Sequence, residues 1–350
     1  MKSSKARNRS LTCRSGWLGV EYLRELVGVA GLMLFLTLAA KSGMDPADDA
    51  AKVRDHRPPV YALGFTGGRN TLWISQLKSG ASDYCWKTGE LIAQWPVLSH
   101  TLCDIARGGS DFVTTVVSST NGQIVIIHDD EVQTRFEVVP VDCPVQDVDV
   151  AGDGRSVYAV RKGQELLEWH WNGTAFEGKT TALPCEAESL RVSPDGNRLL
   201  MTSAGVDLVV QDLPDGTQPI TISRAHDQRI TQCIWSPDGR RFASGGDDGM
   251  VRLWNAETGE LIWAARGDNL APMALAFSPE GSRLAVGGFD NSIRVFAADT
   301  GAKTAEAPGH SGPIRALAYD PTGAVLASGD LKGHVLIWSA SDCRLLRELQ

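Results

Sequence analysis

Three acidic side chains come nearest to a pattern that could do acid–base chemistry: Asp104, Asp147 and Asp149. Carboxylates hydrolyse a substrate only when two or more of them converge on it. The chain contains no GxGxxG, GxSxG, CxxC or HExxH motif and no Walker loop, and its seven histidines are scattered. The sequence therefore predicts no enzyme, no cofactor and no metal. A lactonase- or glycosidase-like hydrolase built on these acids is the alternative.

A turn glycine that returns every 42 to 45 residues shows which elements must position these side chains. A unit of this size cannot bury its own apolar face, so a fixed period predicts repeats that stack on their neighbours. The turn glycines are Gly109, Gly154, Gly196, Gly239, Gly281 and Gly323.

The clearest unit, residues 224–265, contains four β-type runs at 230–235, 242–245, 250–254 and 261–265. Pro-Asp-Gly, Asp-Asp-Gly and Glu-Thr-Gly-Glu turn signals separate them. Four strands joined by tight turns form one antiparallel sheet, and repetition of that sheet around an axis gives a β-propeller. The sequence predicts an all-β, seven-bladed propeller over residues 58–350. The predicted blades are 58–97, 98–138, 139–179, 180–223, 224–265, 266–308 and 309–350.

This unit resembles the WD40-repeat family, whose members are propellers and mostly interaction scaffolds. The resemblance rests on the SPDG turn at 236–239, the VRLWN stretch and four polar or aromatic residues: His226, Ser244, Asp248 and Trp254. It implies that these four side chains form a buried hydrogen-bond network that makes the blade rigid. Their predicted role is therefore structural and not catalytic.

The other copies depart from this pattern. Residues 266–308 keep Asp290 but lack the histidine and place Phe296 where the tryptophan would stand. Residues 309–350 keep His310, Ser328 and Trp338, whereas Lys332 occupies the aspartate position. In the last copy, residues 343–349 can supply the outer strand themselves. The ring is then expected to close by packing between its first and last blades.

The resemblance also indicates where a partner would bind. Propellers bind through loops around one end of the channel, which the sheets hold rigidly. The family pattern places Arg229, Asp247, Phe289 and Leu331 there. Phe289 is the sharpest candidate because an exposed aromatic residue in a turn can anchor a partner; the alternative is that it folds onto a neighbouring blade.

The N-terminal segment has the charge order of an export signal: a basic leader at 1–25 followed by an apolar run within 26–44. Residues 1–41 carry a net charge of +5, and residues 45–57 have the composition of a linker. We expect a membrane anchor with the propeller outside the cytoplasm. Cleavage would instead release a secreted or periplasmic protein, and a start at Met44 would give a cytoplasmic one.

Residues 42–350 carry a net charge of −13, which disfavours nucleic-acid binding because the propeller would repel a polyanion. Cys143 and Cys185 stand at the start of adjacent predicted inner strands. In an exported protein they either form a disulfide or remain two unlinked thiols. The predicted function is a non-enzymatic scaffold that binds a protein or peptide; a cytosolic signalling or assembly scaffold is the alternative.

Overall fold

A computed structural model of the chain describes residues 57–349, except for 67–70, 77–79, 96–101, 109–112, 120–122, 130–133, 141–144, 162–163, 214–217 and 268–270. Between residues 93 and 144 it describes the backbone alone. Residues 57–350 form one compact unit, and the predicted leader and apolar segment lie outside the described residues. No helix in the described part is long and apolar enough to span a membrane.

The described strands form seven four-stranded antiparallel sheets, which we call blades 1 to 7 in chain order. The prediction of an all-β propeller with four-stranded blades is confirmed. Blade 1 contains β1 (Val60–Thr66), β2 (Thr71–Gln76), β3 (Gly80–Cys85) and β4 (Leu91–Trp95). Blade 2 contains β5 (Leu102–Gly108), β6 (Val113–Ser119), β7 (Gln123–Asp129) and β8 (Thr134–Pro140). Blade 3 contains β9 (Val145–Val150), β10 (Ser156–Arg161), β11 (Glu165–Trp171) and β12 (Phe176–Ala182).

The remaining four sheets follow the same order from inner to outer strand. Blade 4 contains β13 (Ala187–Val192), β14 (Arg198–Ser203), β15 (Asp207–Asp212) and β16 (Ile220–Ile222). Blade 5 contains β17 (Ile230–Trp235), β18 (Arg241–Gly246), β19 (Met250–Asn255) and β20 (Leu261–Arg266). Blade 6 contains β21 (Pro272–Phe277), β22 (Arg283–Gly288), β23 (Ser292–Ala297) and β24 (Lys303–Pro308). Blade 7 contains β25 (Ile314–Tyr319), β26 (Val325–Asp330), β27 (Val335–Ser339) and β28 (Leu345–Leu349).

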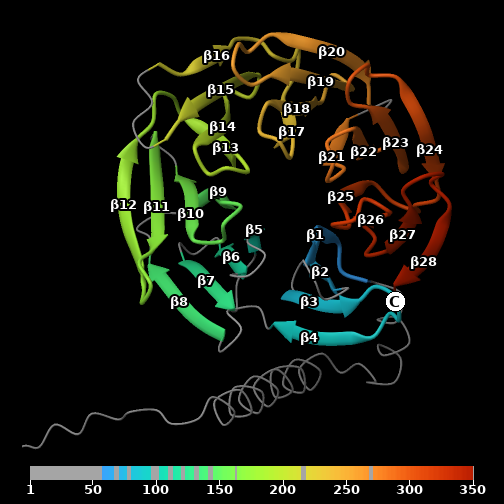
Figure 1. The fold of residues 1–350 in the computed structure, drawn as a ribbon, viewed down its shortest axis with the longest axis horizontal. Coiled ribbons are helices and arrows are strands. Elements are labelled where there is room, and N and C mark those ends of the chain that lie inside the picture. Colours follow the sequence, from blue (N-terminus) through green and yellow to red (C-terminus); the bar gives the residue numbers. More distant parts are fainter. Residues whose placement is uncertain are drawn as a thin grey trace, which may run out of the picture. The chain divides into compact units, whose positions relative to one another are not determined.

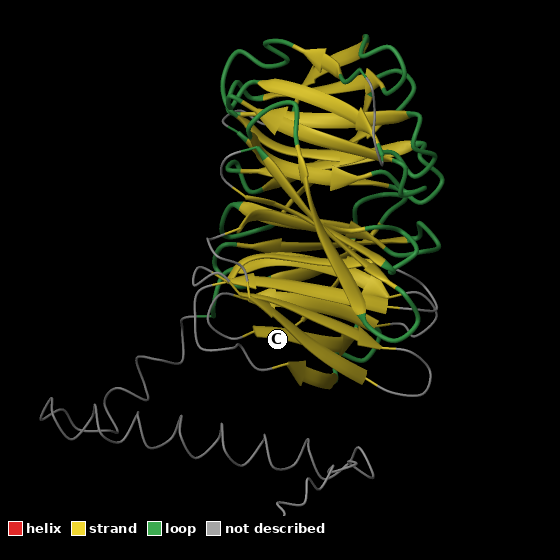
Figure 2. Ribbon diagram, turned by 90° about the vertical axis from the view of Figure 1, so that its left-hand side faces the viewer, coloured by secondary structure: helices red, strands yellow, loops and turns green. Residues whose placement is uncertain are grey.

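The core lies between neighbouring blades, which surround a central axis (Figures 1 and 2). Second strands such as β18 and β22 are buried along almost their whole length because neighbouring sheets cover both of their faces. Outer strands such as β20 are largely exposed. One core cluster joins Ala243 and Val251 of blade 5 to Leu284 of blade 6. Each blade therefore depends on its neighbours for burial, as the repeat period predicts.

The turns between inner and second strands account for the glycine period. All five described turn glycines have φ between 66° and 75°: Gly154, Gly196, Gly239, Gly281 and Gly323. This is a left-handed backbone conformation that residues other than glycine adopt at a cost in free energy. In each of these turns the glycine N–H donates to the carbonyl three residues earlier, as from Gly239 to Ser236 at 2.9 Å. The period is thus a backbone requirement.

Three arginines, each two residues after a turn glycine, form hydrogen bonds that connect blade 4 to blade 5, blade 5 to blade 6 and blade 6 to blade 7. Arg198 donates to the Gly239 carbonyl at 2.5 Å, Arg241 to the Gly281 carbonyl at 3.2 Å, and Arg283 to the Gly323 carbonyl at 2.9 Å. The sequence analysis did not single out these residues. Their common offset from the turn glycine is the signal that could have found them.

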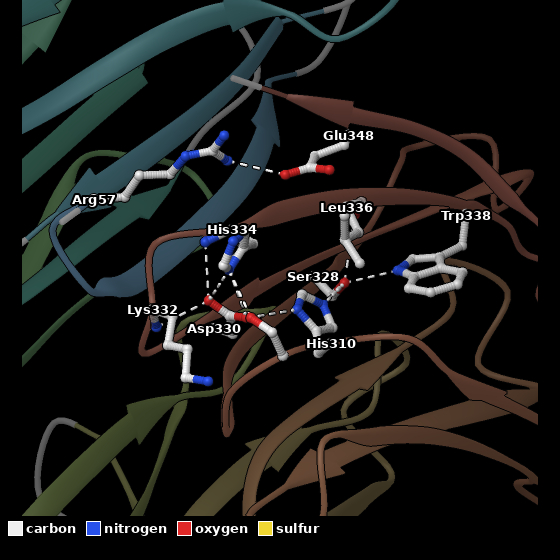
Figure 3. Close-up of polar contacts among 10 residues, drawn as sticks. Arg57, His310, Ser328, Asp330, Lys332, His334, Leu336, Trp338 and Glu348 are labelled. Carbon is white, nitrogen blue, oxygen red and sulfur yellow. Dashed lines mark hydrogen bonds and ion pairs between the residues drawn. The ribbon is translucent and has the colours of Figure 1, made fainter. Parts of the chain in front are cut away.

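The ring closes without exchange of strands between its first and last blades. The C-terminal strand β28 pairs with β27 in blade 7, and β1 to β4 form blade 1 alone. Val60 and Leu63 of blade 1 pack with Ala327 of blade 7 in one core cluster. Arg57 and Glu348 form an ion pair at 3.0 Å across the same junction (Figure 3). Apolar packing with few polar contacts therefore closes the ring, as expected from the sequence.

Candidate functional site: the channel mouth and the networks beneath it

In blade 5 the four residues of the predicted network form one hydrogen-bonded chain. His226 Nδ1 lies 3.0 Å from Asp248 Oδ1, and His226 Nε2 lies 2.7 Å from Ser244 Oγ. Trp254 Nε1 donates to Ser244 Oγ at 2.9 Å. Arg252 adds a bond to Asp248 Oδ2 at 2.8 Å. The chain joins the loop before the inner strand to the second and third strands.

The environment fixes the charges of this network. Burial lowers the pKa of His226 despite its bond to Asp248, so the ring is neutral at pH 7. Burial works against ionisation of Asp248, but hydrogen bonds from His226 and Arg252 outweigh it and lower the pKa of Asp248 to about 2. The Asp248 carboxylate and, at 2.6 Å, the Arg252 guanidinium both contact His226 Nδ1, so the direction of the bond between His226 Nε2 and Ser244 follows from the tautomer of the ring.

This order of serine, histidine and aspartate matches that of a nucleophilic triad. Its setting excludes that use, because Ser244 has no exposed surface and its oxygen accepts the Trp254 N–H. A nucleophile must be reachable by its substrate. The chain of bonds can therefore hold the blade together but cannot attack a bound molecule.

Blade 7 contains the same kind of network (Figure 3). His310 Nε2 lies 2.6 Å from Ser328 Oγ, which also accepts from Trp338 Nε1 at 2.7 Å. His310 Nδ1 lies 3.1 Å from Asp330 Oδ2. A second histidine, His334, also contacts the Asp330 carboxylate, at 3.1 Å. Every polar group of this buried set has a partner, which is the condition for such a network to stabilise a core.

The carboxylate of blade 7 comes from a position that the sequence analysis overlooked. Lys332 stands where the aspartate was expected, and its side chain is exposed. Asp330, two residues earlier, corresponds to Gly246 of blade 5 by strand register. A Cβ at Gly246 would collide with the His226 ring, whereas Asp330 reaches His310 from the strand itself. Blade 7 thus obtains the same bonds from a different site.

Blade 6 replaces the polar network with apolar side chains. Val286 pairs with Arg294 as Ser244 pairs with Arg252 in blade 5. Phe296 takes the place of the tryptophan, and both Val286 and Phe296 are buried. Asp290 remains and forms an ion pair with Arg294 at 2.5 Å. The residue that would correspond to the histidine, 268, lies outside the described residues.

Every inner strand has a register shift at its second residue, which marks a β-bulge. A bulge leaves one residue unpaired and changes the direction of its side chain. We call these seven positions the bulge ring. Its members are Tyr61, Cys103, Gln146, Glu188, Thr231, Met273 and Arg315. The sequence analysis did not identify them, because a bulge leaves no motif and these residues share no chemical type.

The bulge ring lies at the end of the ring where the inner strands start and the second strands finish. Ile230, the first residue of β17, pairs with Gly246, the last of β18, so the turn after β18 lies at the same end. We call this end the channel mouth. It includes the bulge ring and the turns between second and third strands.

Three of the predicted partner-binding residues occupy equivalent places at the mouth. The N–H groups of Asp247, Phe289 and Leu331 donate to the carbonyl of the residue before the inner strand of their own blade, at 2.8, 3.3 and 2.9 Å. The fourth residue, Arg229, supplies that carbonyl in blade 5. Arg229 and Asp247 are exposed, Leu331 is half-buried, and Phe289 exposes 43% of its surface.

The acids considered for catalysis are bound to backbone where they are described. Asp147 Oδ2 accepts from the Leu190 N–H at 2.9 Å, and Asp149 Oδ2 accepts from the Val192 N–H at 2.8 Å. Both bonds join blade 3 to blade 4. Burial raises the pKa of Asp149 to about 6. The Asp104 side chain lies outside the described part, and no cluster of side chains suited to a metal occurs in the described residues.

The described residues include only one member of the predicted cysteine pair. Cys185 is half-buried and carries a free thiol in this structure. Burial raises its pKa. Cys143 lies outside the described residues. The choice between a disulfide and two thiols therefore stays a prediction.

Comparison with known proteins agrees with this geometry. Residues 217–255, 265–296 and 301–339 match the family model for the WD domain, G-beta repeat. WD repeat-containing protein 1-B of Xenopus laevis is 30% identical over 157 residues, which are 43% of this chain and 24% of that protein. The serine-threonine kinase receptor-associated protein of Dictyostelium discoideum is 31% identical over 85 residues, 24% of this chain and 29% of that protein.

Short matches extend to larger proteins. The ribosome biogenesis protein erb1 of Botryotinia fuckeliana is 41% identical over 63 residues, which are 18% of this chain and 8% of that protein. The chain spans about a quarter of the length of the first curated relatives it matches. The three matched stretches, together with the four-stranded blades and the buried networks, show WD40 repeats over residues 217–339 of this chain.

Proposed function

We propose that the chain is a non-enzymatic scaffold that binds a protein or a peptide at the channel mouth. The observation that carries this proposal is the contrast between the bulge ring and the networks beneath it. The networks are buried and fully bonded, whereas the described bulge ring residues of blades 1 and 3 to 7 are of six different types. Rigid strands that display varied side chains suit recognition of a specific partner.

Phe289 is the side chain on which we place most weight. It exposes 43% of its surface at the mouth, and exposed aromatic residues are frequent anchors in interfaces. Substitution Phe289→Ala should reduce capture of the partner by about tenfold or more without lowering the melting temperature. Quantitative affinity capture with the full-length chain, paired with a thermal melt, tests this expectation.

Ile262 provides a matched control, because it is also 43% exposed but lies on the outer strand of blade 5. The Ile262→Ala variant should capture the partner as the unmodified chain does. Equal loss in both variants would place the interface elsewhere. A lower melting temperature for Phe289→Ala with unchanged capture would show that Phe289 packs on a neighbouring blade.

We further propose that the N-terminal segment tethers the propeller to a membrane with the propeller outside the cytoplasm. The basic leader and the apolar run within 26–44 support this proposal. Protease treatment of intact cells should then digest the propeller while the protein stays in the membrane fraction. Recovery of the whole protein in the soluble cytosol would support the same scaffold acting inside the cell.

A further inference from the structure

The described mouth carries two acidic side chains on blade 4 and two basic ones on blade 7, and the exposed Arg229 of blade 5 extends past Gly205 of blade 4. On blade 4, Glu186 and Glu188 are exposed at the start of the inner strand β13. On blade 7, Arg315 belongs to the bulge ring and Lys332 is exposed in the turn after β26. Blades follow in chain order around the axis, so blade 4 lies across the channel from blades 7 and 1 (Figure 1). We call the two sides the acidic side and the basic side.

The basic side also carries the apolar surface of the mouth. Tyr61 of blade 1 exposes 40% of its surface and Phe289 of blade 6 exposes 43%. Leu331 of blade 7 lies between these two blades in the ring and is half-buried. Blades 6, 7 and 1 therefore each carry an apolar side chain at the mouth, and blade 7 also carries Arg315 and Lys332. No comparable pair of exposed large apolar side chains occurs on the described mouth residues of blades 3 to 5.

Hydrogen bonds connect members of the bulge ring to the inner strands of neighbouring blades. The Arg315 guanidinium donates to the Met273 carbonyl of blade 6 at 3.4 Å. Thr231 Oγ1 donates in the same way to the Pro272 carbonyl. The first bond joins two members of the bulge ring, Arg315 and Met273. The second joins Thr231 of the bulge ring to Pro272, the residue before Met273.

We propose that the mouth binds an extended peptide segment whose charges are arranged in a fixed order: an acidic residue beside an apolar one over blades 6, 7 and 1, and a basic residue over blade 4. This inference rests on the proposed function and adds the chemistry and the direction of the partner. Charge complementarity of this kind sets the register of a partner and disfavours the reversed orientation. The net negative charge of residues 42–350 makes a polyanion a poor match for the acidic side.

Selection from a peptide library tests the proposal. The full-length chain, purified in a mild detergent, is exposed to displayed eight-residue peptides with every position randomised. Bound peptides should be enriched in Asp or Glu next to a large apolar residue at one end, and in Lys or Arg at the other. Because an exposed charge pair contributes about 1 kcal/mol, removal of either charge should weaken binding about fivefold.

Charge exchange across the mouth supplies the decisive variants. Lys332→Glu and Glu188→Lys should each weaken binding of the selected peptide about fivefold. The double variant should bind peptides without a preferred order of charges, because Arg315 and Glu186 remain and balance the two introduced charges. A matched control is Lys87→Glu combined with Glu257→Lys, since both residues are exposed in turns at the other end of the ring. The control should leave the selected sequences unchanged.

The outcomes separate this inference from the function on which it rests. Enrichment without any order of charges, but lost in Phe289→Ala, would overturn the inference and keep the proposed function. Enrichment with an order of charges that the double variant keeps would also overturn it. Absence of any enriched peptide from the unmodified chain would count against both.

Discussion

Blades 5 and 6 are neighbours built on the same register, yet they stabilise their strands in different ways. Blade 5 uses a chain of buried hydrogen bonds through His226, Ser244 and Trp254. Blade 6 has Val286 and Phe296 at the serine and tryptophan positions. Of the polar residues in the blade 5 pattern, the described part of blade 6 keeps the aspartate and arginine, as the Asp290–Arg294 ion pair. Removal of one partner leaves a buried polar group without a hydrogen bond, whereas replacement of all partners by apolar groups costs little.

Blade 7 shows that the bonds matter more than the positions that supply them. Its aspartate comes from a site two residues before the expected one, and the network is still complete. The comparison teaches that these side chains are a means of joining strands. The blades differ more at the mouth, where no two described members of the bulge ring have the same side chain.

The largest expected effect follows from removal of the carboxylate in blade 7. Asp330 is fully buried and accepts from two histidine rings and from the N–H groups of Lys332 and His334. Asp330→Ala should therefore lower the free energy of unfolding by about 3 to 5 kcal/mol. Urea unfolding at pH 7 measures this loss. Asp247→Ala, in an exposed turn, should change it by less than about 0.5 kcal/mol; similar losses in both variants would contradict the comparison.

The second prediction concerns pH. Hydrogen bonds from His310 and the His334 N–H outweigh burial and lower the pKa of Asp330 to about 2. Because the folded-state pKa lies below the usual value of 3.8, the stabilisation is present above about pH 4 and is lost as the pH falls towards 2. The difference in unfolding free energy between the unmodified chain and Asp330→Ala should shrink by about 2 kcal/mol over that range. A constant difference between pH 5 and pH 3 would show that Asp330 does not act as a carboxylate.

Blade 5 can be converted in steps towards blade 6. Ser244→Val alone should cost about 2 to 3 kcal/mol, because it leaves the His226 and Trp254 nitrogens buried without their shared partner. Trp254→Phe should cost less in the Ser244→Val background than in the unmodified chain. The double-mutant cycle should give a coupling energy of about 1 kcal/mol or more. Additive losses would mean that the bonds do not act together.

The reverse change in blade 6 should give the smallest effect. Phe296→Trp places an indole N–H beside Val286, which cannot accept it, and should cost about 1 kcal/mol. Val286→Ser in the same chain should recover part of that loss. Thermal melts of the two single variants and the double variant measure the recovery. A double variant less stable than both single variants would show that blade 6 cannot accommodate a polar pair.

Much of the fold could be predicted from the sequence, because the turn glycines are backbone requirements that leave a period. The closure of the ring followed from the C-terminal strand in the same way. Asp330 was missed because the sequence pattern assumes one position for the carboxylate, whereas hydrogen bonding requires only that it reach His310. The bulge ring was missed because a bulge depends on the pairing of two strands and has no residue type of its own.

One paired measurement tests most directly whether the buried networks stabilise the fold while the channel mouth binds the partner. The melting temperature and the affinity for a peptide selected from the library are determined for Ser244→Val and Phe289→Ala. We predict a crossed result: Ser244→Val lowers the melting temperature and leaves the affinity of the folded protein unchanged, while Phe289→Ala weakens binding about tenfold and leaves the melting temperature unchanged. Loss of binding by Ser244→Val well below its melting temperature, with full binding by Phe289→Ala, would contradict this account.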